Sequence, residues 1–328
     1  MIIPIIWLIV GFVLLIKGGD WFVDGATGIA RRLHLPELLI GATVVSIGTT
    51  LPEVMVSAGA ALQGSGSIAY GNAIGSIICN TSLIAALTIA IKPSNAERKS
   101  LILPVVFFFS SAVIYCITAY VFGRFSLISG LILLTVFIAF MISTVLSMKN
   151  SATSLEKTEP DETEKEENES KGSLLKDIFL LVLGAAVIAV GADLLVDNAI
   201  IIAEKFGVSE KVIGLTIVAL GTSLPEFVTA ITALIKGHSA LSLGNIIGAN
   251  LFNLVLVSGV AVTINPFDVP VSSTLFGINS SLVLDLPVML IVMIILTVPT
   301  LIKQKLSRWQ GISLLLIYSA FVVLQFAL

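Results

Sequence analysis

A six-residue phrase ending in a glutamate occurs twice in this chain of 328 residues, each time inside a long apolar stretch. It reads Gly-Thr-Thr-Leu-Pro-Glu at 48–53 and Gly-Thr-Ser-Leu-Pro-Glu at 221–226, and the two copies are 173 residues apart. Within a helix, a proline removes the hydrogen bond to the carbonyl four residues earlier and so frees backbone oxygens. Carboxylate, hydroxyl and free carbonyl oxygens suit hard cations such as Ca²⁺ and Na⁺ rather than Zn²⁺ or Cu²⁺. The two phrases therefore predict a cation site built on Glu53 and Glu226.

An asparagine follows each phrase at the same distance. Gly-Asn-x-x-Gly occupies 71–75 and again 244–248, and Asn80 and Asn253 come after these segments. Glycines four residues apart lie on one helix face and allow a second helix to approach closely. We expect this approach to bring the amide oxygens of Asn80 and Asn253 towards the glutamates. For the asparagines inside the glycine motifs, Asn72 and Asn245, ion contact and plain interhelical hydrogen bonding fit the sequence equally well.

The composition places these residues in a membrane. Hydrophobic residues make up 56% of the chain and charged residues 12%, with a mean hydropathy of +1.06. A soluble domain of this composition would lack a polar coat. The apolar runs are continuous and roughly 20 residues long, which predicts membrane-spanning helices rather than the alternating strands of a barrel. About ten spans are expected, at 2–28, 38–62, 68–91, 101–122, 125–147, 176–203, 212–235, 240–264, 281–302 and 309–327.

A polar, acidic segment separates two sets of five spans. We expect a first five-helix repeat at 1–148, a linker at 149–175 and a second five-helix repeat at 176–328. The segment 151–173 cannot bury apolar surface, so a mobile linker is predicted. It also lacks the ligand spacing of a calcium-binding loop. Because each half has an odd number of spans, the second half enters the membrane from the opposite side. The expected fold is an all-α polytopic membrane protein made of two inverted repeats.

The distribution of lysine and arginine predicts the orientation. Under this topology most basic residues lie on the same side as the linker, and the opposite side has only Arg124, Lys205 and Lys211. Lysine- and arginine-rich loops stay in the cytoplasm. We therefore expect a multi-pass protein of the plasma membrane with a cytoplasmic acidic linker and both termini extracellular.

Four further acids recur in the two halves near helix ends. Asp20 and Asp24 correspond to Asp193 and Asp197. Structural capping or ion pairing is expected for these acids rather than transport, and Lys17 is a candidate partner.

Taken together, the doubled glutamate phrase and the asparagine motifs closely resemble the α-repeats of the sodium/calcium exchangers. These exchangers, which include prokaryotic members, belong to the calcium/cation antiporter superfamily. The motif pairs cover 41–84 and 214–257, and the topology match extends over the whole chain. The resemblance implies ten helices, ion ligands near the membrane midplane and competition between Ca²⁺ and Na⁺. It implies neither an enzyme nor a resident cofactor.

The resemblance also implies roles for individual residues. It places Ca²⁺ on Glu53 and Glu226 with help from Thr49 and Thr222. It places Na⁺ on overlapping sites formed by the side chains of Thr50, Ser76 and Ser223 and by the carbonyls of Ser46 and Ala219. One departure from the family pattern is Ala249, which stands where the first repeat has Ser76. One hydroxyl is therefore missing, and the neighbouring Asn250 is a candidate replacement.

The expected function is exchange of cytosolic Ca²⁺ for external Na⁺ by alternating access, independent of K⁺. Two carboxylates neutralise one Ca²⁺ or two Na⁺, so the same site cannot favour both cargoes at once. Asn80 and Asn253 are neutral and supply no further charge for K⁺, whereas family members that use K⁺ tend to carry Asp at the position of Asn253. The expected partners are the two ions and the lipid bilayer. A monomer should suffice, and no basic, aromatic-rich patch suggests nucleic acid.

Other functions remain compatible with the same oxygen ligands. A Ca²⁺/H⁺ exchanger would use the two glutamates as titrating groups, and a K⁺-dependent Na⁺/Ca²⁺ exchanger would add a third ion. A cation channel could use the same ligands, but inverted repeats with paired broken helices favour a carrier. An intramembrane hydrolase would need a water-activating geometry, for which the sequence offers no motif.

Overall fold

The computed structural model describes residues 2–156, 166–206, 221–271, 274–275 and 277–327 and is almost entirely helical. In this described part, eight helices are long and apolar enough to cross a membrane, and α11 (Leu224–Ile235) is a shorter apolar helix. A further helix, α15 (Arg308–Ala327), occupies the last expected span. The prediction of an all-α polytopic membrane protein is confirmed.

Several spans contain a π-helical turn, labelled η, between α-helical segments. The first half consists of α1 (Ile2–Arg32), α2 (Glu37–Ile40), η1 (Gly41–Val45), α3 (Ser46–Leu62), α4 (Gly66–Cys79), η2 (Asn80–Ala85), α5 (Ala86–Ile91), α6 (Arg98–Ile117), η3 (Thr118–Phe122) and α7 (Leu127–Glu156). The second half consists of α8 (Glu166–Lys205), α11, α12 (Ser239–Phe252), η5 (Asn253–Val257), α13 (Ser258–Ile264), η6 (Ser281–Asp285), α14 (Leu286–Lys303) and α15. Only the part of the expected span 212–235 from Gly221 onwards lies among the described residues.

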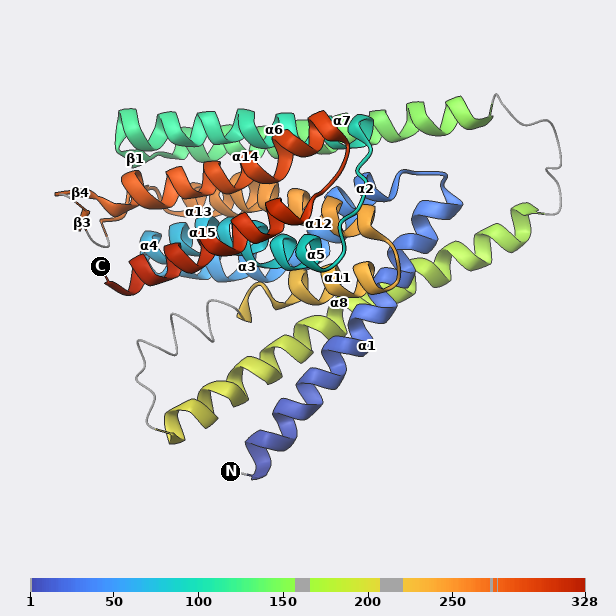
Figure 1. Ribbon diagram of the computed structural model, residues 1–328, viewed down its shortest axis with the longest axis horizontal. Helices are drawn as coiled ribbons and strands as arrows, with labels where there is room; N and C mark the ends of the chain where they lie inside the picture. Colours follow the sequence, from blue (N-terminus) through green and yellow to red (C-terminus); the bar gives the residue numbers. More distant parts are fainter. Residues whose placement is uncertain (1, 157–165, 207–220, 272–273, 276, 328) are drawn as a thin grey trace.

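Two short antiparallel ladders occur in the loops at one end of the bundle (Figure 1). They pair β1 (Arg124–Phe125) with β2 (Phe267–Asp268), and β3 (Thr274–Leu275) with β4 (Ile278–Asn279). An all-helical pattern did not predict them, because a two-residue strand has no hydrophobic period of its own.

Two side-chain contacts recur at corresponding positions of the two halves. Lys92 Nζ lies 3.4 Å from the carbonyl oxygen of Leu234, and Asn265 Nδ2 donates to the carbonyl oxygen of Ala61 at 3.2 Å. The two contacts are related by the same 173-residue step. A single bridge between Asn95 and Lys305 resembles the pairing of Arg124 with Asp268, although only Asn95 and Asp268 are related by the 173-residue step. The repeat thus extends beyond the glutamate motifs into the loops.

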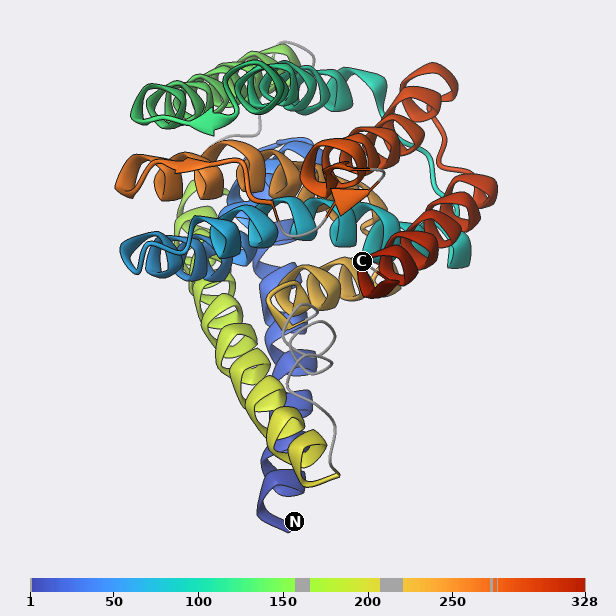
Figure 2. The same cartoon turned by 90° about the vertical axis from the view of Figure 1, so that its left-hand side faces the viewer.

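Helices α1 and α8 form a pair that stands apart from the other helices and crosses them obliquely (Figures 1 and 2). Glycines allow this close approach. A Cβ atom added at Gly25 would lie 2.5 Å from the carbonyl oxygen of Asp177, and one at Gly184 would lie 2.4 Å from the backbone nitrogen of Phe22. Arg32 at the end of α1 forms an ion pair with Asp177 of α8. The two helices therefore behave as one structural unit.

An ion-pair cluster ties α1 to α11. Lys236 Nζ lies 3.3 Å from Asp20 Oδ1 and 2.8 Å from Asp24 Oδ1. Lys17, the partner suggested by the sequence, forms no ion pair among the described residues, although it lies on the same face of α1 as the two acids. Lys236, from the end of α11, pairs with both acids instead. The corresponding acids of α8, Asp193 and Asp197, form no ion pair with any described residue, and Gln63 occupies the position that corresponds to Lys236.

Helix extends into both sides of the expected linker. Helix α7 continues to Glu156 and α8 already begins at Glu166, so helix occupies part of 149–175. The flanking sequence contains no glycine or proline between Lys149 and Glu156, and its Lys, Ala, Leu and Glu residues favour helix. Residues 157–165 lie outside the described part, and the proposed mobility of this segment remains a prediction.

Candidate cation site

The two glutamates lie on α3 and α11 and are both completely buried. Among the described residues, neither carboxylate oxygen of Glu53 has a hydrogen-bond donor, and Glu226 Oε2 has none either. Thr50 Oγ1, from the other repeat, donates to Glu226 Oε1 at 3.5 Å. Ionised buried carboxylates without partners are strongly destabilising unless a cation or a proton compensates their charge. The two halves of the chain therefore bring their carboxyl groups into one buried region.

Asn80 and Asn253 begin the π-helical turns η2 and η5. Both are fully buried. Neither amide atom of Asn80 has a partner in the described part of the chain, and the Oδ1 of Asn253 has none. The Nδ2 of Asn253 donates to the carbonyl of Ala249 at 3.0 Å, so its oxygen faces away from its own helix backbone. Single π-helical turns often occur at functional sites, and these two leave amide oxygens available to a cation.

Asn72 and Asn245 make interhelical hydrogen bonds. Asn72 Nδ2 donates to the carbonyl of Glu53 at 3.1 Å and to Ser57 Oγ at 2.8 Å, which ties α4 to α3. Asn245 Oδ1 accepts a bond from Thr49 Oγ1 at 3.2 Å, which ties α12 to α3. Of the two alternatives that the sequence left open, the structure supports interhelical bonding as their role.

Helix α12 packs closely on α2, η1 and α3, and this packing brings Asn245 next to Ser46 and Thr49. A Cβ atom at Gly244 would lie 2.1 Å from the carbonyl oxygen of Leu38, and one at Gly248 would lie 2.4 Å from Ser46 Oγ. The predicted close approach thus exists at these two glycines. No described atom comes within 4 Å of a Cβ built at Gly71 or Gly75. By the 173-residue step, the counterparts of Leu38 and Ser46 are Lys211 and Ala219, which lie outside the described residues.

The remaining candidate ligands lie mostly in the interior. Thr49, Thr50, Ser46, Ser76 and Ser223 are buried, whereas Thr222 is half-buried in the turn before α11. Ala219 lies outside the described residues, so the proposed contribution of its carbonyl stays a prediction.

The two proline phrases differ in local structure. Pro52 lies inside α3, which continues from Ser46 to Leu62, whereas Pro225 lies in the first turn of α11. The hydroxyl of Ser46 also participates in the packing, because it lies 2.8 Å from the Gly41 carbonyl and 2.9 Å from that of Asn245. In the second phrase the expected break in the helix is present, because Thr222 and Ser223 form a turn before α11. In the first phrase the helix is not broken at Pro52, and α3 directly follows the π-helical turn η1.

Asn250 stays a candidate replacement for the hydroxyl that is missing at Ala249, because its buried Oδ1 has no partner among the described residues. Its Nδ2 donates to Thr81 Oγ1 at 2.7 Å and contacts the sulfur of Met293 at 3.2 Å. The amide nitrogen is thus engaged with η2 and α14, and the amide oxygen remains free among the described residues. Ala249 itself is fully buried and contributes its carbonyl to the bond with Asn253.

Two buried hydroxyls near the glutamates were missed. Ser57 lies four residues after Glu53, and Thr229 lies three residues after Glu226; both are fully buried. Thr229 Oγ1 has no partner among the described atoms. Residues three or four apart lie on the same helix face, so the helical period alone could have identified both.

Comparison with known proteins identifies the family. Residues 3–146 and 176–327 match the family described as "sodium/calcium exchanger protein". This chain belongs to the sodium/calcium exchanger family. It is a prokaryotic-type member of the calcium/cation antiporter superfamily, whose characterised function is Ca²⁺ antiport.

Full-length relatives of this exchanger-family protein support the assignment. It is 32% identical to the sodium/calcium exchanger MaX1 of Methanosarcina acetivorans over 97% of each chain. It is also 34% identical to the uncharacterized membrane protein MJ0091 of Methanocaldococcus jannaschii, over 97% of this chain and 96% of the relative. Among solved structures, the sodium-calcium exchanger NCX_Mj soaked with Na⁺ and Sr²⁺ superimposes with a TM-score of 0.80 at 33% identity, over 98% of each chain.

Proposed function

We propose that this exchanger moves Ca²⁺ out of the cytosol in exchange for Na⁺, with both ions competing for the site between α3 and α11. The observation that carries this proposal is the pair of fully buried glutamates, which leave three carboxylate oxygens without a described partner. Two negative charges balance one Ca²⁺ or two Na⁺. A third Na⁺ would carry net charge and make transport sensitive to voltage, by about 2.3 kcal/mol per charge per 100 mV.

The ligand roles that we propose follow the positions of the oxygens. Glu53 and Glu226 bind Ca²⁺ with the hydroxyls of Thr49 and Thr222. Na⁺ uses overlapping positions that include the amide oxygens of Asn80 and Asn253. The other Na⁺ ligands are the side chains of Thr50, Ser76 and Ser223 and the carbonyls of Ser46 and Ala219. These assignments rest on burial, on unpartnered oxygens and on the family resemblance.

Alternating access is supported by unequal burial of corresponding residues. The α1–α8 pair covers α11, where Val228 is half-buried and Thr229 is 0% exposed. The corresponding residues of α3, Met55 and Val56, are 71% and 43% exposed. When one unit of an inverted-repeat transporter moves against the other, the covered helix of one repeat can become exposed and its counterpart covered. In the proposed cycle, the α1–α8 pair moves to cover α3 and uncovers α11.

The proposed orientation places both termini outside the cell and the acidic linker in the cytoplasm. It rests on the excess of lysine and arginine at the end of the bundle that carries Lys92, Lys236 and Lys305. Both glutamates come from one chain, so a monomer in the plasma membrane is the proposed transport unit.

Transport should be driven by Na⁺ and should not require K⁺. Binding Ca²⁺ already neutralises Glu53 and Glu226, so an added K⁺ would leave a positive charge at the membrane midplane, which is costly. The test is ⁴⁵Ca²⁺ uptake into proteoliposomes under separately imposed Na⁺, K⁺ and H⁺ gradients. Uptake that stops when K⁺ is removed from both sides would identify a K⁺-dependent exchanger. Uptake driven by H⁺ alone would identify a proton-coupled one, and Ca²⁺ flux without any counter-ion would identify a channel.

The substitution Asn253→Asp should alter this ion dependence. It adds a third negative charge beside the two glutamates without changing the side chain's shape. We expect either a new response to K⁺ or at least a tenfold loss of exchange, because a cation held too tightly is not released (tenfold is about 1.4 kcal/mol). The measurement is the same uptake assay with and without K⁺, and Asn198→Asp on α8 serves as a charge-matched control. Unchanged rate and ion dependence in Asn253→Asp would remove Asn253 from the ion site.

Replacing Ser154–Glu169 by glycine and serine at constant length should leave Ca²⁺ uptake within about twofold of wild type, because a polar segment outside the spans tolerates change. The measurement is initial uptake rate per reconstituted protein, with thermal unfolding as a check of folding. A well-folded variant with little uptake would show that the acidic segment regulates transport.

A further inference from the structure

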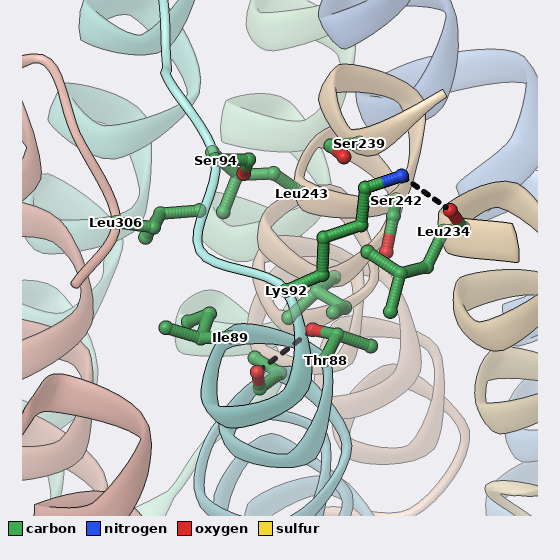
Figure 3. Close-up of a pocket in the computed structure, with 11 residues that line it drawn as sticks. Thr88, Ile89, Lys92, Ser94, Leu234, Ser239, Ser242, Leu243 and Leu306 are labelled. Atoms are coloured by element: carbon green, nitrogen blue, oxygen red, sulfur yellow. Dashed lines mark hydrogen bonds between the residues drawn. The ribbon is translucent and has the colours of Figure 1, made fainter. Parts of the chain in front are cut away.

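A small pocket opens at the lysine-rich end of the bundle and is lined by residues other than the candidate ion ligands (Figure 3). It lies between the ends of α5, α11 and α12 and the loop before α15 and is open to solvent, and its inner part has room for about one water molecule. The hydroxyls that line it belong to Thr88, Ser94, Ser239 and Ser242, and the Lys92 side chain extends along it.

The donors in this pocket are largely unused. Lys92 forms no ion pair with a described acid, and its Nζ reaches only the carbonyl of Leu234 at 3.4 Å. Ser242 is 3% exposed, and its hydroxyl lies beside the Lys92 side chain without a described hydrogen-bond partner. The hydroxyls of Ser94 and Ser239 also bond to no described residue. The pocket therefore presents one ammonium group and three free hydroxyls.

The first turn of α12 adds backbone donors. This helix of 14 residues begins at Ser239, and the preceding residue, His238, makes no side-chain capping bond. The first backbone N–H groups of a helix lack partners within the helix, and the helix dipole favours an anion at this end. Ser239 and Ser242 both lie in this first turn and line the pocket.

The symmetry-related position is filled instead. The 173-residue step relates Ser94 to Phe267, Ser239 to Gly66 and Lys92 to Asn265. A Cβ atom at Gly66 would lie 2.3 Å from the Phe267 ring, so the aromatic side chain occupies the corresponding space. The polar pocket is therefore not a requirement of the repeat, since the other copy packs the same place with an aromatic ring.

We propose that this pocket binds a phosphate group, from either a lipid headgroup or free phosphate. Lysine, hydroxyl and helix N-terminal N–H donors are the groups that bind phosphate. The nearby acids are engaged elsewhere: Glu37 Oε1 lies 2.8 Å from His238 Nδ1, and Glu97 accepts a bond from Ser100. Leu306, which lines the pocket, lies between Lys305 and Ser307 in the sequence.

The test is thermal unfolding of the purified full-length protein without Ca²⁺, with a chelator present because calcium phosphate is insoluble. One arm titrates potassium phosphate in detergent, and the other compares nanodiscs with and without phosphatidic acid. We expect a saturable rise in unfolding temperature in at least one arm. Lys92→Gln should need at least about ten times more phosphate or phosphatidic acid for half the effect, because it removes a charge-assisted contact. Ser242→Ala should weaken the response less.

The matched control is Lys99→Gln, which removes an exposed positive charge from the same end of the bundle outside the pocket. It should respond like wild type. Stabilisation by phosphatidic acid alone would identify a lipid headgroup as the source, and stabilisation by inorganic phosphate would show that the free anion suffices. The proposal is overturned if neither probe stabilises the protein saturably, or if Lys92→Gln responds like wild type.

Discussion

Glu53→Gln and Glu226→Gln should each abolish Na⁺-driven Ca²⁺ uptake. Each substitution removes half of the negative charge at the buried site and keeps the shape of the side chain. In the Ca²⁺-bound state each carboxylate is one partner of a buried pair with the cation, and loss of one partner of such a pair costs about 3–5 kcal/mol. Uptake in proteoliposomes should therefore fall by at least about a hundredfold at limiting Ca²⁺.

The folded state should survive these substitutions. Both carboxylates are fully buried, and three of their four oxygens have no hydrogen-bond donor among the described residues. Glutamine should therefore leave the ion-free protein at least as stable as wild type in thermal unfolding. Glu204→Gln, an exposed carboxylate on α8, is the matched control and should transport normally. Near wild-type Ca²⁺ uptake in either buried variant would refute the central role of the glutamates.

Gly248→Ala should destabilise the protein and impair transport together. The added methyl group would lie 2.4 Å from Ser46 Oγ and 2.5 Å from the carbonyl oxygen of Ala42, so α12 must move away from η1 and α3. Overpacking of this kind costs about 1–3 kcal/mol. The same displacement would separate Asn245 from Thr49, which should lower the apparent affinity for Ca²⁺. Thermal unfolding and the Ca²⁺ dependence of uptake are the two measurements.

Gly59→Ala on α3 is the control for this substitution. No described atom lies within 4 Å of a Cβ built at Gly59, and alanine favours helix over glycine by about 1 kcal/mol. This variant should be as stable as wild type or slightly more stable. Equal stability and uptake in Gly248→Ala and Gly59→Ala would contradict a tight contact between α12 and α3.

The membrane fold was predictable because the bilayer tolerates few structures. Long apolar runs must form helices there, and a glutamate in such a run stands out because its burial is costly. The Thr50–Glu226 contact accordingly joins two motifs that the sequence had already paired. The π-helical turns at Asn80 and Asn253 were not predictable, since no residue type encodes a π-helical turn by itself.

Differences between the repeats were harder to predict than their similarity. Asn72 donates to Ser57, but Ala230 occupies the corresponding position near Asn245 and offers no hydroxyl. Asn245 instead accepts from Thr49 and lies close to Ser46. Identical asparagines thus acquire different partners from small changes on neighbouring helices. Such changes carry no signal until the helices are placed in contact.

The cluster of Lys236 with Asp20 and Asp24 gives the proposed cycle an energetic preference for one conformation. Gln63 takes the place of the lysine in the other repeat, so the opposite conformation has no equivalent ion pair. A partly exposed ion pair is worth about 0.2–1 kcal/mol, enough to change the ratio of two conformations by up to about fivefold. Because the two conformations would be unequally populated, the same site would show a different apparent affinity for ions from the cytoplasm than for ions from outside the cell.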